Sequence, residues 1–413
     1  MNHLPNDSVD LLVQTLRFAQ NPKNIAELRQ NFLSPQTDLD ALFVAAKRRQ
    51  LTTVMIENLS AKGIVHPAPS GSTASSSLRG QFRHFADSHA ARRAALTKQL
   101  ADLAGILNTA GITPLMLKGA ATLVTGEPSW REQRDIDFAI RPDQVALTKA
   151  VLKQNGFVQW IEIDTNHHHL SPLKRPDDPV FVEPHARING SRSEHLLPDK
   201  MLWDASVEVD FASHRVRLLR PDHFLLQGLT HHHFQNRGGV LGVINIKGLL
   251  EFSDAIRRLE GGEVARLRDF LGGSHQLAEA VELWCAAGQL LLGAHIPEDL
   301  LPSQAAYRRA EAIWAGTPRT PGFVFNSNYL HFTGSSSDAA LTKGFERLRS
   351  QIKTSEQRFR LIFYTIWPFK KARQMLLKPL FRSRDRQLSA GIMLFDEERR
   401  MPPPIQVDPR TLP

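Results

Sequence analysis

The sequence predicts an α+β protein in which an α/β core is flanked by an N-terminal and a C-terminal helical region. Hydrophobic residues recur at helical spacing over residues 8–62 and again from Pro221 onward. Between these regions, short apolar runs alternate with helical segments, as strands and helices do in an α/β unit. We therefore expect the central part of the chain to hold the sheet and to carry the chemistry.

Changes in composition divide the chain into five segments. Within the first, a stretch rich in Ser, Pro and Gly at about residues 65–78 is typical of a linker, and a similar stretch at residues 317–337 is typical of a loop. The predicted segments are an N-terminal helical region (1–110), the α/β core (111–220), a C-terminal helical region (221–316), a loop followed by a basic aromatic segment (317–386) and a disordered tail (387–413).

The bulk composition is that of a globular protein without a membrane span. Hydrophobic residues make up 42% of the chain and charged residues 23%, both ordinary values. No apolar stretch reaches the ~20 residues that cross a bilayer, and the N-terminus lacks the basic and apolar regions of a signal peptide, so we expect a cytoplasmic location. The single cysteine, Cys285, excludes an internal disulfide, and its helical surroundings favour a buried structural thiol over a nucleophile.

The positive charge of the chain is concentrated near its C-terminus. Residues 345–386 contain 12 lysines and arginines against 3 acidic residues, a surplus of 9 that equals the net charge of +9 of the whole chain. The core is therefore not generally cationic. Within this segment, residues 359–371 mix aromatic with basic side chains, and three interpretations stay open: a core helix with a solvated basic face, contact with anionic lipid at a membrane surface, or contact with nucleic-acid phosphates.

The elements around the core follow from apolar spacing and from helix signals. Gly111 follows the long helix expected at 82–110. Pro142 stands near the start of the helix expected at 142–155, and Gly156 stands after its end, as is usual for these residue types. In chain order we expect a long helix (82–110), a strand (112–117), a helix (120–124), a strand (136–140), a helix (142–155) and two strands (157–163 and 180–188).

Two aspartates, Asp135 and Asp137, lie at the start of the strand expected at residues 136–140, with one residue between them. Side chains alternate along a strand, so both carboxylates point to the same face. Mg²⁺ prefers such carboxylates together with phosphates and water. Upstream, Lys118 and Gly119 lie where a strand ends and a helix begins, and the N-terminus of a helix binds phosphate. The sequence therefore predicts that Mg²⁺ and a nucleoside triphosphate meet here.

A third carboxylate is expected from Glu183. A site with two metal ions that clamp an in-line displacement usually needs a third acid besides Asp135 and Asp137. Glu183 is an acid inside an otherwise apolar strand, where its charge would be costly to bury without a cation. The alternative places Glu183 on a solvent-facing edge strand, with which the adjacent Pro184 is compatible.

Together these motifs resemble the uncharacterised bacterial nucleotidyltransferase family of the DNA polymerase beta-like superfamily. The resemblance covers about residues 82–255 and rests on three short motifs. They are Leu-Lys-Gly at 117–119, an Arg four residues before Asp-Ile-Asp at 131–137, and Val-Glu-x-His at 182–185. It implies a mixed sheet flanked by helices, with Asp135, Asp137 and Glu183 as the metal ligands.

The chain departs from the pattern of the superfamily at the phosphate turn and next to the third acid. Lys118 and Gly119 stand where the superfamily has a Gly-Ser turn, so a lysine would hold the triphosphate as a point charge and the usual hydroxyl is absent. Pro184 stands where a longer apolar residue is more common, and Ala186 replaces an aromatic residue.

Several charged and imidazole side chains accompany the acids. Arg131 and Arg134 precede the aspartates, and we expect both to bind nucleotide; Arg131 would pair with the triphosphate or with Asp137, the alternative being solvated loop arginines. His169 and His185 are expected beside the site as supporting residues, with packing or hydrogen bonding elsewhere as the alternative.

Two histidine triplets and one later acid complete the set. Consecutive residues point apart, so neither residues 167–169 nor residues 231–233 offer the converging ligands that zinc needs. The resemblance implies that one of the second triplet faces the sheet. Glu251 matches a position usually held by Asp in the family, and we interpret it as structural.

The sequence thus predicts a nucleotidyltransferase that uses Mg²⁺, or Mn²⁺, to move a nucleoside monophosphate from an NTP to an acceptor hydroxyl with release of pyrophosphate. A sugar, a peptide, a protein and a nucleic acid stay open as acceptors. Two alternatives remain: a non-catalytic nucleotide-binding or scaffold protein with the same fold, and an RNA-modifying transferase that uses the basic segment.

Overall fold

The structure, a computed structural model, describes the chain from residue 8 to residue 332 with gaps. The described residues are 8–18, 22–34, 36–65, 78–160, 168–236, 238, 244–316, 323–326 and 329–332. They belong to one compact unit, formed by residues 1–161 and 168–337. The predicted basic segment and tail, and most of the predicted linker at 65–78, lie outside the described residues, as does the second unit, residues 162–167 and 338–413.

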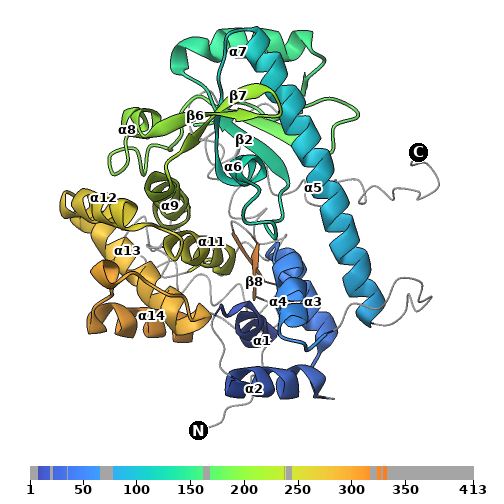
Figure 1. Ribbon diagram of the computed structural model, residues 1–413, viewed down its shortest axis with the longest axis vertical. Coiled ribbons are helices and arrows are strands. Elements are labelled where there is room, and N and C mark those ends of the chain that lie inside the picture. Colours follow the sequence, from blue (N-terminus) through green and yellow to red (C-terminus); the bar gives the residue numbers. More distant parts are fainter. Residues whose placement is uncertain are drawn as a thin grey trace, which may run out of the picture. The chain divides into compact units, whose positions relative to one another are not determined.

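The N-terminal region is helical, as predicted. Asp38 caps one of the short helices, because its side chain accepts a hydrogen bond from the backbone N–H of Ala41 at 2.8 Å. A long helix follows and runs from the short helices to the sheet (Figure 1). The helices are α1 (Ser8–Leu16), α2 (Pro22–Leu33), α3 (Leu39–Arg48), α4 (Thr52–Ala61) and α5 (Leu78–Thr109).

Seven strands in the described part of the chain form one mixed sheet, in the order β3-β4-β5-β2-β1-β7-β6. At its centre β2 is parallel to β5 and antiparallel to β1, and β1 is parallel to β7. The predicted α+β class with a small mixed sheet is therefore confirmed. The strands are β1 (Leu115–Met116), β2 (Asp135–Ala139), β3 (Val158–Gln159), β4 (Leu173–Lys174), β5 (Phe181–His185), β6 (Ser206–Phe211) and β7 (His214–Leu219).

The connections within the core agree with the predicted helices to within a few residues. The helix expected after the glycine turn begins at Lys118, and the helix expected at 142–155 begins with a single 3₁₀ turn at Pro142. These elements are α6 (Lys118–Thr125), η1 (Pro142–Gln144), α7 (Val145–Gln154) and the short α8 (Asp199–Asp204).

The β6–β7 hairpin was not predicted, and its turn explains why. Ala212 and Ser213 connect the strands, and both have positive φ angles, +49° and +66°. Two-residue hairpin turns of this kind usually contain Asn-Gly or Asp-Gly, because glycine and asparagine tolerate positive φ. Since this turn carries neither glycine nor asparagine, the sequence lacks the usual hairpin signal.

The loop predicted at residues 317–337 contains two short strands, which corrects that prediction. β8 (Phe323–Asn326) and β9 (Tyr329–Phe332) pair in antiparallel fashion. Both strands are rich in aromatic residues, and β8 adds Val324; the strand preference of these residues outweighs the Gly, Pro and Ser residues around them.

The C-terminal region is helical, as predicted. Asn245 and Ser274 cap two of its helices by accepting backbone N–H groups. Cys285 is buried in one of these helices, as expected of a structural thiol. The elements are α9 (Pro221–Thr230), η2 (His231–Gln235, a π-helix), α11 (Ile246–Ile256), α12 (Gly261–Gly272), α13 (His275–Ala287), η3 (Gly288–Leu292, a π-helix), η4 (Glu298–Leu300) and α14 (Gln304–Gly316). No described helix is both long and apolar enough to cross a bilayer.

Two clusters of buried hydrophobic side chains hold these elements together. One lies between the sheet and the C-terminal half of α5, and includes Leu103 and Phe138. The other joins the N-terminal helices to the C-terminal helices, and includes Leu12 and Trp284. The long helix therefore covers the sheet, while the two helical regions share a core; the domain boundaries at residues 110 and 220 stay a prediction.

Candidate active site

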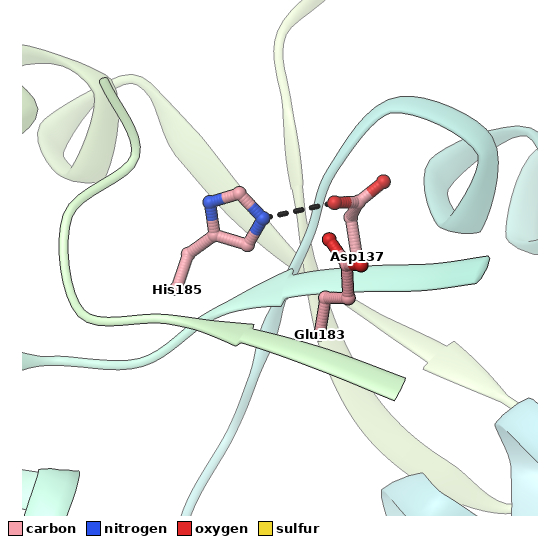
Figure 2. A group of neighbouring side chains, drawn as sticks. All are labelled: Asp137, Glu183 and His185. Carbon is pink, nitrogen blue, oxygen red and sulfur yellow. Dashed lines mark hydrogen bonds and ion pairs between the residues drawn. The ribbon is translucent and has the colours of Figure 1, made fainter. Parts of the chain in front are cut away.

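Strands β2 and β5 bring two of the predicted acids together. In the parallel register Asp137 is directly opposite Glu183, and His185 follows two residues later on the same face of β5. One ligand atom from each of Asp137, Glu183 and His185 lies within 4.8 Å of the other two (Figure 2). Because β5 lies between β4 and β2, Glu183 is on an interior strand and not on the edge strand that the alternative required.

Asp137 contacts two basic side chains. Its Oδ1 atom lies 2.9 Å from Lys118 Nζ and 2.9 Å from His185 Nε2. Burial alone would raise the pKa of Asp137, but the charge of Lys118 and the hydrogen bond from His185 hold it well below its usual range. The neighbouring carboxylates in turn raise the pKa of Lys118 against the effect of burial. Asp137 and Lys118 are thus both charged at neutral pH.

The other two acids have raised pKa values in this buried site. Burial raises the pKa of Glu183 well above its ordinary value, and the charges of Asp135 and Asp137 add to this. Burial and the charge of Asp137 raise the pKa of Asp135 to about 6, although Lys118 opposes them. The charge of Asp135 therefore affects the other acids of the site. The close group of three, however, consists of Asp137, Glu183 and His185 and does not include Asp135.

The predicted phosphate turn has an unusual backbone. Lys118 has a φ of +45°, a conformation that side chains with a Cβ rarely adopt and that is often found at functional sites. At Gly119, an added Cβ would lie 2.3 Å from Arg131 Nη1 and 2.9 Å from Gln133 Cγ. Only glycine leaves room for Arg131 and Gln133 to pack against the start of α6.

Helix α11 adds a lysine and an acid to the site. Arg131 does not pair with Asp137; its Nε lies 2.9 Å from Glu251 Oε1. Lys247, one turn earlier on α11, lies 3.9 Å from the same oxygen. Burial and the charge of Arg131 lower the pKa of Lys247 to about 8. The sequence analysis missed Lys247; the available signal was a lysine and a glutamate four residues apart in a mostly apolar helix.

Arg134, also expected to bind nucleotide, lies further out. It is exposed, next to Asp135 in the sequence. Its charge acts on Arg92 of α5, whose pKa is lowered by burial and by Arg134. The nucleotide-binding role of Arg134 stays a prediction.

The histidines divide between the site and the packing around it. His169 forms an isolated β-bridge with His185, and the two rings are 5.4 Å apart; their supporting role at the site stays a prediction. His231 is also near, because Lys118, Asp137 and His185 all influence its pKa, which burial lowers well below the ordinary value. His232 stacks on the ring of Trp284 at 6.1 Å, and burial together with the charges of Lys247, Arg131 and Lys118 lowers its pKa to about 4.

His233, the third of the consecutive histidines at 231–233, also contacts Trp284. His233 Nδ1 accepts a hydrogen bond from Trp284 Nε1 at 3.2 Å. His232 and His233 thus both contact Trp284.

The donor set fits a divalent cation. Atoms bound to one ion at about 2.1 Å lie about 3 to 4.2 Å apart, so small side-chain movements would bring a group within 4.8 Å around one ion. Burial and the charges of Asp135 and Asp137 hold the pKa of Glu183 well above its ordinary value, so ionising all three acids requires more positive charge than Lys118 supplies. A divalent ion would supply that charge.

A mixed sheet with acids on adjacent strands, beside a glycine turn that opens a helix, is the arrangement expected of a nucleotidyltransferase core. The sequence profile of a family described as "Uncharacterised nucleotidyltransferase" matches residues 35–277, more than half of the chain. The chain belongs to this family. The match confirms the family that the motifs resembled and extends it to include α3 and α4.

The chain was also compared with solved structures and with curated proteins. A solved structure described as an antigenic nucleotidyltransferase-like protein from Paracoccidioides brasiliensis is similar to 52% of this chain and to 96% of its own chain, with 19% sequence identity and a TM-score of 0.28. No curated protein matches this sequence.

Proposed function

We propose that the protein moves a nucleoside monophosphate from an NTP to a hydroxyl of an acceptor and releases pyrophosphate, using Mg²⁺ or alternatively Mn²⁺. The observation that carries the proposal is the pairing of Asp137 with Glu183 across β2 and β5, next to Lys118. Membership of a nucleotidyltransferase family supports nucleotidyl transfer as the class of reaction.

The acids would hold the divalent ion. Asp135, Asp137 and Glu183 are the ligands of choice, because they share one buried, negatively charged site. When bound, the ion supplies positive charge to the triphosphate and to the attacking oxygen. His185 lies beside these acids, with its Nε2 hydrogen-bonded to Asp137 Oδ1 at 2.9 Å.

The turn and its neighbours would bind the triphosphate. Lys118 brings a full positive charge to the acids, and the N–H groups in the first turn of α6 are further donors. Arg131 lies against Gly119 and is held there by Glu251, so its guanidinium is fixed beside the same turn. Arg134, at the exposed side, is the remaining candidate for a phosphate contact.

Nucleotide transfer is tested with labelled ATP, CTP, GTP and UTP, each offered sugars, peptides, proteins and RNA as acceptors. We expect transfer to one class of acceptor and its loss in the double variant Asp135→Ala, Asp137→Ala. Asp204→Ala, which removes an exposed aspartate on α8, is the matched control and retains activity. Unchanged turnover in the double variant would overturn the assignment.

A non-catalytic nucleotide-binding protein is the second candidate. It is favoured by one observation: Lys118 and Arg131, the cations expected to bind triphosphate, are already paired with Asp137 and Glu251. Calorimetry separates the two functions. Tight NTP binding without pyrophosphate release in the presence of any acceptor class supports this second function.

An RNA-modifying transferase remains a prediction from the sequence, since its basic segment lies outside the described residues. Its test is the salt dependence of RNA binding before and after deletion of residues 345–413. An unchanged salt dependence contradicts it.

A further inference from the structure

We propose that His185 binds the divalent ion directly through Nε2, beside Asp137 and Glu183, and that this nitrogen ligand makes the site prefer Mn²⁺ to Mg²⁺. The inference rests on the proposed function, because it assumes that the acids hold an ion. It goes further by adding a ligand that carboxylate-based reasoning does not supply, and by naming the metal.

The spacing of the atoms is the first argument. Two adjacent ligands of a six-coordinate ion with bonds of about 2.1 Å lie about 3 Å apart. His185 Nε2 and Asp137 Oδ1 lie 2.9 Å apart, already at the spacing of adjacent ligands. Glu183 and His185 are two residues apart on β5, so both point to the face from which Asp137 rises (Figure 2).

The packing of the imidazole is the second argument. The side chain of His185 is only 1% exposed. Its ring packs against two others, 5.3 Å from the ring of His168 and 5.4 Å from that of His169, which are 4.9 Å from each other. The backbone around it is fixed by the pairing of β5 with β2 and by the bridge to His169. The nitrogen is therefore held toward Asp137, as a ligand of a preformed site has to be.

The chemistry of the donors gives the metal preference. Mg²⁺ takes oxygen ligands and dehydrates reluctantly, whereas imidazole nitrogen suits first-row metals such as Fe²⁺, Ni²⁺ and Zn²⁺; Mn²⁺ lies between, because it also takes carboxylates and water but is the first member of that series. A set of two carboxylates and one imidazole thus favours Mn²⁺ over Mg²⁺ more than a set of carboxylates alone. The competing arrangement is one in which His185 only orients Asp137 by a hydrogen bond, without touching the ion.

Pulsed electron paramagnetic resonance on the full chain loaded with Mn²⁺ alone distinguishes the two arrangements. A directly bound imidazole couples its nitrogen nucleus to the Mn²⁺ spin, and we expect that coupling in the wild-type protein. When the protein contains histidine labelled with the heavier nitrogen isotope, the coupling of the ordinary isotope should disappear and that of the heavier isotope should take its place. This isotope measurement needs no variant, so it shows whether a histidine nitrogen binds the ion even if a substitution at a buried position impairs folding.

Two variants assign the signal. His185→Gln should abolish the nitrogen coupling and lower Mn²⁺ affinity by about tenfold or more, with a smaller loss for Mg²⁺. His168→Gln is the matched control, because it removes a neighbouring imidazole that is outside the close group, and its coupling should equal that of the wild type.

Bound Mn²⁺ without nitrogen coupling would overturn the inference and leave the proposed function standing. Coupling that persists in His185→Gln would also overturn it. If the wild-type protein binds no Mn²⁺, and Asp137→Asn behaves like the wild type, the inference and the metal-dependent part of the proposed function both fail.

Discussion

Arg131 and Glu251 form an ion pair across 120 residues of the sequence. Arg131 Nε lies 2.9 Å from Glu251 Oε1, and Nη2 donates to Oε2 at 3.4 Å. The pair ties the loop before β2 to α11. Since Arg131 also packs against Gly119, the acid on α11 fixes an arginine against the turn at which we propose that phosphate binds.

We expect Glu251→Ala to destabilise the protein by about 3 kcal/mol, because removing one member of a buried pair leaves the other without a counter-charge. Arg131 is 11% and Glu251 23% exposed at the side chain, and Lys247 loses the same partner. Urea unfolding measures the change. Adding Arg131→Met should cost less than the sum of the two single changes, because the unpaired charge is then removed.

The control for this prediction is an exposed ion pair. Arg268 and Asp299 are both more than half exposed, so Asp299→Ala should change the free energy of unfolding by less than about 0.5 kcal/mol. The buried pair contributes little if Glu251→Ala is as stable as Asp299→Ala.

Glu183→Gln should stabilise the metal-free protein and abolish transfer. Burial and two neighbouring acids raise the pKa of Glu183, so protonation favours the folded state. That contribution is complete below the unfolded pKa of about 4.3 and is lost as the pH rises through the folded value. At pH 7 the neutral amide therefore removes a penalty, and the urea midpoint should rise.

The same change removes a metal ligand. We expect transfer to fall by about 100-fold or more, and added Mn²⁺ to stabilise the wild type but not the variant. Glu279→Gln, at an exposed position of α13, should alter neither quantity. A wild-type urea midpoint that does not respond to Mn²⁺ would argue against a metal at this position.

Gly119→Ala should weaken ATP binding and lower stability by about 1–3 kcal/mol, because the new Cβ would clash with Arg131 Nη1 at 2.3 Å. Calorimetry and urea unfolding measure the two effects. Gly228→Ala is the matched control: Gly228 lies within α9, and nothing lies within 4 Å of its added Cβ. That variant should gain up to about 1 kcal/mol. If the two variants had equal ATP affinity and equal stability, close packing of Arg131 against Gly119 would be contradicted.

Asp222, at the start of α9, should contribute stability that is lost in acid. Burial raises its pKa, but the hydrogen bond with His223 and the charge of Arg266 outweigh burial and lower the pKa to about 2. The stabilisation is therefore present above the unfolded pKa of about 3.9 and disappears as the pH falls through about 2. Asp222→Asn should be less stable than the wild type at pH 7, by about 2 kcal/mol.

Denaturant unfolding at several pH values checks this prediction. The difference between Asp222→Asn and the wild type should shrink between about pH 4 and pH 2. A difference that does not change over that window would show that Asp222 acts through packing and not through its charge.

The sequence located the acids of the site because their spacing is local. Asp135 and Asp137 share a face through the two-residue period of a strand, and Glu183 stood out as an acid in an apolar run. The turn at Lys118 was also visible, since a lysine and a glycine directly after an apolar run mark the end of a strand. The β6–β7 hairpin was not visible, because Ala212 and Ser213 adopt positive φ without the residue types that usually do so.

By itself, then, the sequence determined the family, the order of most elements and the residues that carry negative charge into the core. Only the tertiary structure decided their neighbours. The register of β2 against β5 placed His185 beside Asp137, and the shared core of the helical regions placed α11 so that Glu251 reaches Arg131. Such contacts depend on packing between residues far apart in the chain, which local periodicity does not encode.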